Sequence, residues 1–363
     1  MLVEKDFVYN HNFELIDGGI SEWSAPSNIA LVKYWGKKDH QIPANPSISF
    51  TLKNCKTTTK IEFKKKGSNT NKEGFSFDFI FDGKTNDAFK PKIQKFLERI
   101  NVYCPYLTNY HLMISSSNTF PHSSGIASSA SGMAALAMNV MDFERLLNPE
   151  MSDDFFYKKA SFLARLGSGS ACRSVNGSIV AWGKQKDFTE SNDWFGVEVK
   201  QIAPVFLTFQ DTILLVDKGE KKVSSTVGHN LMINHPFSEQ RFIQAHETMS
   251  KLKSVLEQGL LEKFITIVER EALTLHAMMM TSLPYFVLMK PNTLHIINKI
   301  WEFRAKTNIS VCFTLDAGAN VHVLYPENVK EIVLQFINSE LVGYCQNDQY
   351  ICDEIGHGAQ KII

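Results

Sequence analysis

The stretch from Pro121 to Ser131 constrains this chain more than any other, because it places a flexible, hydroxyl-rich turn directly before a helix. Its sequence is PHSSGIASSAS, and it follows an alternating apolar run that is typical of a strand. Glycine lets the backbone turn tightly and approach a ligand closely. The small residues of 132–140 predict a helix whose first amides have no partner within the helix and point out of its positive end. A phosphate group suits that position.

We therefore predict that Ser128, Ser129 and Ser131 surround a bound phosphate. An ordinary serine-rich helix start explains the same residues, because serine is a favoured N-cap. The stretch lacks the Gly-Lys-Ser/Thr ending of a Walker A loop and the Gly-x-Gly-x-x-Gly spacing of a dinucleotide-binding loop. By itself the motif leaves a phosphate site and a plain helix cap open.

Length and charge narrow the class of protein. At 363 residues the chain exceeds what one hydrophobic core usually serves, so we expect two domains. Its net charge of zero argues against bulk binding of nucleic acid or of an anionic membrane. No apolar run reaches the ~20 residues of a membrane span, and the N-terminus has no signal-peptide pattern, so we expect a cytoplasmic protein. The six cysteines form no Cys-x-x-Cys pair and are expected to be reduced thiols.

Strand and helix patterns alternate irregularly along the chain, which favours an α+β architecture over a doubly wound sheet. Apolar runs and alternation predict strands at 29–32, 48–52, 57–63, 75–81, 178–182, 212–216, 310–315 and 321–324. Helical spacing predicts helices at 87–100, 132–140, 155–166, 237–256, 260–277, 291–306 and 327–340. A polar connection at 185–194 is the expected neighbourhood of a domain boundary, and we divide the chain into 1–200 and 201–363.

Polar clusters lie beside these predicted elements at Asn28 with 33–37, in the serine-rich loop, at 168–173 and at 316–320. Each has a plain explanation, such as a solvated edge, a structural ion pair or a turn acid. Together they supply what phosphoryl transfer needs: cations and amides for phosphates, and an acid that positions the attacking hydroxyl.

The same clusters carry a specific resemblance. The segments APSNIALVKYWGK (25–37), PHSSGIASSA (121–130), GSGSACRS (167–174), STVG (225–228) and DAGAN (316–320) occur in order. Together they resemble the diphosphomevalonate decarboxylase family, a branch of the galactose, homoserine, mevalonate and phosphomevalonate (GHMP) kinase group. The resemblance spans 24 to about 358. The serine loop marks only the wider group, whereas KYWGK and GSGSACR are specific to the decarboxylase branch.

The resemblance implies a two-domain GHMP kinase fold with the active site in the cleft between the domains. The first domain would contain a left-handed β-α-β unit, an exception to the usual handedness, and the second would be ferredoxin-like. The implied reaction uses ATP and Mg²⁺ to phosphorylate the 3-hydroxyl of mevalonate 5-diphosphate, after which phosphate and carbon dioxide leave and isopentenyl diphosphate remains. The resemblance also implies a homodimer with a small-molecule substrate. The zero net charge argues against nucleic acid or a membrane as partner.

It further implies roles for individual residues. Asp316 would accept or orient the hydroxyl proton, Lys33 would lie near Asp316 and the transferring phosphate, and Arg173 would bind the substrate carboxylate. Asn28 would hydrogen-bond near that carboxylate. The 5-diphosphate would be held by Tyr34, Lys37 and Ser225. The ATP phosphates would be held by Ser124, Gly125, Ser128, Ser129 and Ser131, with Ser129 on the metal.

Departures and alternatives remain. The family's usual Asp-Ala-Gly-Pro-Asn has Ala319 in place of proline here, which loosens the loop but keeps the acid. No role is assigned to four further polar residues, which are His122, His276, Lys221 and Lys222. Alternative functions are a phosphomevalonate decarboxylase or a mevalonate-type kinase of the same fold. Two further alternatives fit less well. The intact acid, arginine and lysine argue against an inactive relative that serves as a binding protein, and the zero net charge argues against a nucleic-acid-binding module.

Overall fold

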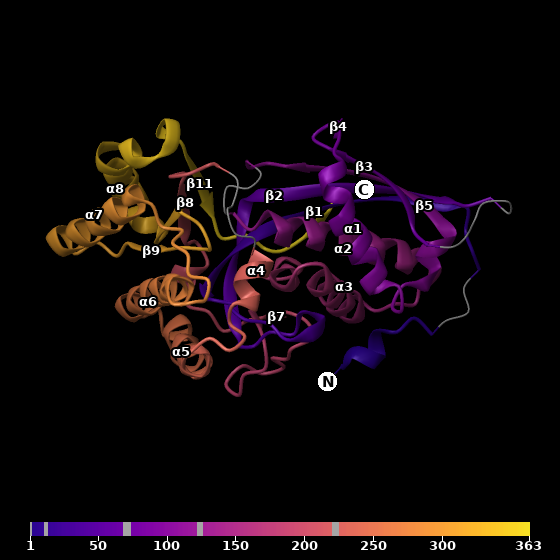
Figure 1. Cartoon of the computed structure of the whole chain (residues 1–363), viewed down its shortest axis with the longest axis horizontal. Coiled ribbons are helices and arrows are strands. Elements are labelled where there is room, and N and C mark those ends of the chain that lie inside the picture. The colour runs from indigo at the N-terminus through magenta and orange to yellow at the C-terminus, as the bar shows by residue number, and fades with distance from the viewer. Residues whose placement is uncertain (1, 11–13, 68–73, 122–125, 220–224) are drawn as a thin grey trace.

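The fold comes from a computed structural model, which describes residues 2–10, 14–67, 74–121, 126–219 and 225–363. Two sheets, each packed against helices, lie side by side (Figure 1). The larger sheet has the order β12-β1-β2-β5-β3-β4, with β6 on β2 and β7 on β6, and the smaller sheet has the order β11-β8-β10-β9. This mixed arrangement confirms the α+β class.

The strands of the larger sheet are β1 (Gly18–Val32), β2 (Ser47–Lys65), β3 (Ser76–Phe81), β4 (Lys84–Thr85), β5 (Tyr110–Asn118), β6 (Ile179–Trp182), β7 (Val197–Glu198) and β12 (Gln360–Lys361). Those of the smaller sheet are β8 (Gln210–Leu214), β9 (Cys312–Thr314), β10 (Val321–Tyr325) and β11 (Tyr350–Glu354). The helices are α1 (Lys90–Ile100), α2 (Ser128–Leu147), α3 (Asp153–Gly167), α4 (Ser225–Asn230), α5 (Ser238–Gln258), α6 (Leu261–Met280), α7 (Pro291–Thr307) and α8 (Lys330–Phe336). None of the described helices is both long enough and apolar enough to cross a membrane.

The strands predicted at 48–52 and 57–63 are one strand, β2, with an irregularity between them. Pro26 of β1 pairs with Lys56 while Asn28 pairs with Thr51, so β2 has extra residues at 52–55. The freed amides of Lys53, Asn54 and Cys55 donate to the carboxylate of Asp353 on β11 at 2.7–3.0 Å. The bend in β2 therefore joins the two sheets.

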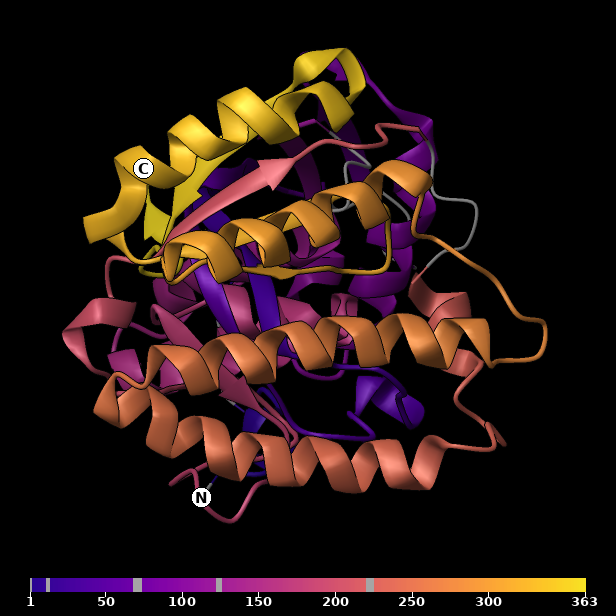
Figure 2. The same ribbon diagram turned by 90° about the vertical axis from the view of Figure 1, so that its left-hand side faces the viewer.

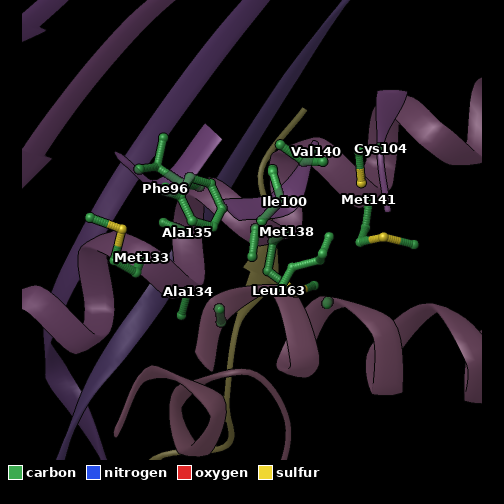
Figure 3. Close-up of a cluster of buried hydrophobic side chains, with 14 of the residues drawn as sticks. Phe96, Ile100, Cys104, Met133, Ala134, Ala135, Met138, Val140, Met141 and Leu163 are labelled. Atoms are coloured by element: carbon green, nitrogen blue, oxygen red, sulfur yellow. The ribbon is translucent and has the colours of Figure 1, made fainter. Parts of the chain in front are cut away.

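The helical layer beside the larger sheet fixes the start of α2. Small buried residues such as Ala134 and Ala137 let α2 lie close to β1 and β2. Figure 3 shows Phe96 of α1, Met138 of α2 and Leu163 of α3 meeting in one apolar cluster. Because this cluster is buried, the first turn of α2 is held at a defined place beside β2.

The helices of the second half enclose the smaller sheet. In Figure 1 this sheet lies between α5 and α6 on one side and α7 and α8 on the other, and Figure 2 shows α5, α6 and α7 running along the same direction. Leu324 packs toward Leu252 of α5, whereas Val323 packs toward Ile296 of α7. The alternation of buried side chains on β10 thus serves both layers.

The β-α-β unit and the path of the last residues bear on the predicted domains. The parallel pair β3 and β5, with α1 between them, forms a β-α-β unit, whose handedness stays a prediction. The end of the chain returns to the larger sheet, because Lys361 of β12 pairs with Trp23 of β1 and Ile355 bridges Leu52 (Figure 1). The division at residue 200 stays a prediction as well, with the last residues lying on the first sheet.

Candidate active site

The site is centred on an ion pair between residues that are 283 positions apart in the sequence. Lys33 follows directly after β1, and its Nζ lies 3.1 Å from Oδ1 of Asp316, which follows β9. The Lys33 side chain is 2% exposed, whereas that of Asp316 is 26% exposed. Burial lowers the pKa of Lys33, and the carboxylates of Asp316 and Glu271 oppose that change. The pair therefore combines a buried cation with an acid that ligands can reach.

Arg173 lies in a short helical turn, Gly169–Ser174, after α3. Its Nε donates to Ser49 Oγ at 2.9 Å and its NH1 donates to Ser47 Oγ at 2.5 Å. It is 2% exposed, and no carboxylate of the described residues forms an ion pair with it. Since its protein partners are neutral hydroxyls and amides, the charge of the guanidinium is left for an anionic ligand.

Asn28 joins this turn to β1. Its Nδ2 donates to Ser174 Oγ at 2.8 Å, and its Oδ1 accepts from Arg173 NH2 at 3.4 Å. The structure thus brings Asn28 and Arg173 together, as the resemblance implied.

Tyr34 and Lys37 lie on the segment after Lys33. The Tyr34 ring contacts Trp182, with centroids 4.7 Å apart, and its buried hydroxyl has no hydrogen-bond partner within the described ranges. Burial raises the pKa of Tyr34, so the hydroxyl remains a donor. Lys37 is partly buried, and burial together with Arg99 and Lys95 lowers its pKa. This end of the site therefore holds positive charge and an unused hydroxyl group.

Helix α4 packs against the same segment. A Cβ on Gly228 would lie 2.4 Å from the indole of Trp35, so only glycine allows this contact. The amide of Gly36 donates to Nδ1 of His229 at 3.0 Å. Ser225 is the first residue of α4, so the backbone of this predicted ligand begins a helix that is docked on 33–37, while its side chain lies outside the described part.

The serine loop is only partly described. Ser124 and Gly125 lie outside the described residues. The N-cap of α2 is Ala127, which has a positive φ of 41° and no side-chain cap, so the plain serine cap is not found among the described residues. Ser128 and Ser129 start the helix, and Ser129 Oγ lies 3.3 Å from Ser168 Oγ. The first turn of α2 thus presents hydroxyls and amides as predicted.

Ser131 differs from its neighbours. Its side chain is fully buried, and its Oγ lies 2.6 Å from Oγ1 of Thr57 on β2. Successive residues on a helix point in directions about 100° apart, so Ser131, the fourth residue of α2, turns toward the sheet while Ser129 stays exposed. The prediction that Ser131 faces the phosphate is corrected: its hydroxyl holds α2 against β2.

An apolar pocket lies beside the first turn of α2. It is lined by Phe79, Phe81 and Phe89 together with Ser128 and Ser129. Three phenyl rings next to hydroxyl groups suit a flat ring that carries a phosphate chain.

Family models of known proteins match most of the chain. Residues 25–193 match the model for the diphosphomevalonate decarboxylase-like N-terminal domain, and 212–359 match the mevalonate 5-diphosphate decarboxylase C-terminal domain. This chain belongs to the diphosphomevalonate decarboxylase family.

Individual relatives and solved structures extend over most of the chain. The diphosphomevalonate decarboxylase of Saccharomyces cerevisiae is 31% identical and aligns over 86% of this chain and 80% of its own length. The crystal structure of mevalonate diphosphate decarboxylase from Staphylococcus aureus superposes with a TM-score of 0.81 at 27% identity, covering 95% of this chain and 98% of that one. The structure of MDDEF with MVAPP, AMPPCP and magnesium gives a TM-score of 0.80 at 27% identity, over 94% and 98% of the two chains.

Several side chains beside the site were not assigned from sequence. His276 contacts the main chain of Asp316, His229 accepts from Gly36, and Glu271 accepts from the amide of Lys33. In the sequence, Glu271 and His276 are ordinary members of a helical pattern, and no local signal distinguishes them from other residues of that helix. Their contacts depend on how α4 and α6 lie against the end of β1.

Proposed function

We propose that this protein catalyses the ATP-dependent decarboxylation of mevalonate 5-diphosphate to isopentenyl diphosphate. The observation that carries the proposal is the contact between Lys33 Nζ and Asp316 Oδ1 next to the buried Arg173. Asp316 accepts the proton of the 3-hydroxyl as that oxygen attacks the terminal phosphorus of ATP. Lys33 stabilises the negative charge that develops between the hydroxyl and the phosphate.

Arg173 and Asn28 hold the substrate carboxylate. When the 3-phosphate leaves with the electron pair of its C–O bond, the pair of the C–C bond to the carboxylate becomes the new double bond, and carbon dioxide is released. The guanidinium, whose neutral partners Ser47 and Ser49 fix its orientation, positions the carboxylate for this loss. No electron-withdrawing cofactor is needed, because phosphate is already a good leaving group.

The 5-diphosphate would be bound by the ammonium of Lys37 and the unused hydroxyl of Tyr34, together with Ser225. ATP would place its phosphates at the first turn of α2 and its adenine ring in the pocket of Phe79, Phe81 and Phe89. A related structure that contains AMPPCP and magnesium supports ATP and Mg²⁺ as the ligands.

Mg²⁺ would neutralise charge on the ATP phosphates. The described residues contain no group of three or more carboxylate, histidine or cysteine side chains able to hold a metal ion. This fits a magnesium ion held by phosphate oxygens, water and the hydroxyl of Ser129 rather than by a protein cage.

A coupled assay with ATP and magnesium tests the proposal. Mevalonate 5-diphosphate should yield ADP and carbon dioxide in equal amounts, and mevalonate 5-phosphate should yield neither. Turnover of the monophosphate alone would identify a phosphomevalonate decarboxylase instead. ADP without carbon dioxide would identify a kinase and remove the role of Arg173 in decarboxylation. No turnover of either substrate would favour a binding protein.

We also propose that the protein acts as a cytoplasmic homodimer, as the family resemblance implies. Light scattering at micromolar concentration should give twice the mass of 41.1 kDa, and a monomer mass would contradict the dimer. Cell fractionation should recover the protein with cytoplasmic markers.

A further inference from the structure

The main chain of Lys33 is held by side chains that come mostly from the second half of the chain. Its amide donates to Oε2 of Glu271 on α6 at 3.0 Å. Its carbonyl oxygen accepts from NH2 of Arg241 on α5 at 3.1 Å and from Nδ2 of Asn45 at 2.9 Å. Both polar main-chain atoms of Lys33 are thus satisfied by buried side chains rather than by a sheet partner.

Glu271 and Arg241 also bind each other. Arg241 NH1 donates to Glu271 Oε1 at 3.0 Å, and NH2 donates to Oε2 at 2.7 Å. The two side chains are 0% and 1% exposed. A buried ion pair is costly to desolvate and is weak evidence for stability by itself. Here the pair fixes geometry, because Oε2 of Glu271 and NH2 of Arg241 bond each other and also bond the main chain of Lys33.

The charges that face Lys33 come from several elements. Asp316 from the turn after β9 contacts the ammonium, and Glu271 from α6 lies at the main chain. Positive groups are Arg173 from the 169–174 turn and Arg241 from α5, and His276 of α6 lies next to Asp316. Arg173 opposes the charge on Lys33, and Glu271 favours it. Glu271 is therefore a second anion for a buried lysine whose first anion must interact with the substrate.

We propose that Glu271 is a positioning residue for the reaction, which together with Arg241 directs Lys33 toward Asp316 and supplies a second negative charge at the buried Lys33. The proposal rests on the proposed function, in which Lys33 acts as a cation. Because Glu271 lies behind Lys33, it contacts neither the substrate nor ATP in this role.

The test compares Glu271→Gln, Glu271→Asp and a matched control, Glu269→Gln. Glu269 lies on the same helix and also pairs with an arginine through two bonds, to NH1 of Arg304 at 2.7 Å and to NH2 at 3.0 Å. It is 7% exposed and makes no contact with Lys33. Kinetics with mevalonate 5-diphosphate would be measured over pH, together with thermal unfolding.

Glu271→Gln should lower kcat by about tenfold to a hundredfold, because the contact of Glu271 with Lys33 helps to stabilise the transition state. The KM for ATP and the KM for mevalonate 5-diphosphate should change little. The high-pH limb of kcat/KM should move about one unit toward lower pH, because an anion that favours charged Lys33 has been removed. Glu271→Asp keeps the charge but shortens the side chain, so kcat should fall while the limb stays in place. Glu269→Gln should lower stability and leave kcat and the limb unchanged.

Three results would overturn the proposal. They are a wild-type kcat in both Glu271 variants, an unchanged high-pH limb of kcat/KM in Glu271→Gln, and an equal shift of that limb in Glu269→Gln. If Glu271→Gln does not fold, Glu271→Asp still decides, since wild-type kcat in that variant contradicts the positioning role. A wild type that turns over no substrate would refute the proposed function separately. The pKa of Lys33, followed by NMR of ¹³C-labelled lysine and assigned with Lys33→Arg, would then test the charge effect of Glu271 without turnover.

Discussion

The ring of His276 holds the main chain of Asp316, with Nε2 donating to the carbonyl oxygen of Asp316 at 3.1 Å. His276 lies on α6 and is 1% exposed. Burial lowers its pKa to about 4, so the ring is neutral at physiological pH and donates through the one nitrogen that carries a proton. A neutral histidine thus supports the backbone of the acid without competing for its charge.

This pKa predicts how stability depends on pH. The unfolded histidine, with a pKa of about 6.5, binds a proton between pH 6.5 and about 4, whereas folded His276 does not. Stability should therefore fall as pH decreases through this range, and His276→Gln should flatten the fall in the melting temperature. His246→Gln, which changes an exposed histidine, is the control. An unchanged pH slope in His276→Gln would contradict the prediction.

Asp316→Asn should reduce turnover by about 10²–10⁴-fold, because the amide cannot accept the hydroxyl proton. The fold should persist, since asparagine retains an oxygen that can accept from Lys33. Rates would be compared with circular dichroism, and with Asp154→Asn, which alters an exposed ion pair with Lys158. Near-normal turnover in Asp316→Asn would exclude the acid as the proton acceptor.

Arg173→Lys should fail to restore activity, although it keeps the positive charge. The three bonds of Arg173 come from three separate nitrogens in one plane, Nε to Ser49, NH1 to Ser47 and NH2 to Asn28, and the single nitrogen of lysine cannot occupy all three positions. We expect Arg173→Lys and Arg173→Gln both to lose at least about tenfold in carbon dioxide release, in keeping with the loss of a charge-assisted hydrogen bond. An active Arg173→Lys enzyme would show that charge alone is sufficient.

Ser129→Ala and Ser131→Ala form a matched pair that separates binding from stability. Ser129→Ala should raise KM for ATP, because this exposed hydroxyl lies in the first turn of α2, where the ATP phosphates are proposed to bind. Ser131→Ala should lower the free energy of unfolding by about 1 kcal/mol through loss of the bond to Thr57 and leave KM for ATP unchanged. The opposite pattern would restore Ser131 as a phosphate ligand.

Gly228→Ala should weaken substrate binding by displacing α4. The new methyl group would lie 2.4 Å from the indole of Trp35, so either the helix or the ring must move. KM for mevalonate 5-diphosphate should rise, whereas Gly343→Ala, which places its methyl group in open space, should change nothing. Equal kinetics for the two variants would indicate that α4 does not shape the substrate site.

Much of the fold could be predicted from local sequence. The helices predicted at 237–256, 260–277 and 291–306 are α5, α6 and α7 with ends shifted by a few residues. These segments carry apolar residues at helical spacing, which is a local property. The single strand β2 was predicted as two, because pattern alone does not show whether a strand bends or stops at an irregularity. The short elements α4, β11 and β12 gave no pattern long enough to detect.

The sequence by itself determined which chemical groups are present: an acid, a lysine, an arginine and a serine-rich helix start, in an order that resembles one family. Only the tertiary structure decided which of them meet. Lys33 lies 3.1 Å from Asp316 and also contacts Glu271, although these residues belong to segments that are far apart in the sequence. Ser131 is buried because of the way in which α2 is rotated against β2. The physical reason is that hydrophobic burial fixes how α2, α5 and α6 lie against β1 and β2, and this packing, rather than any motif, sets which way each polar side chain points.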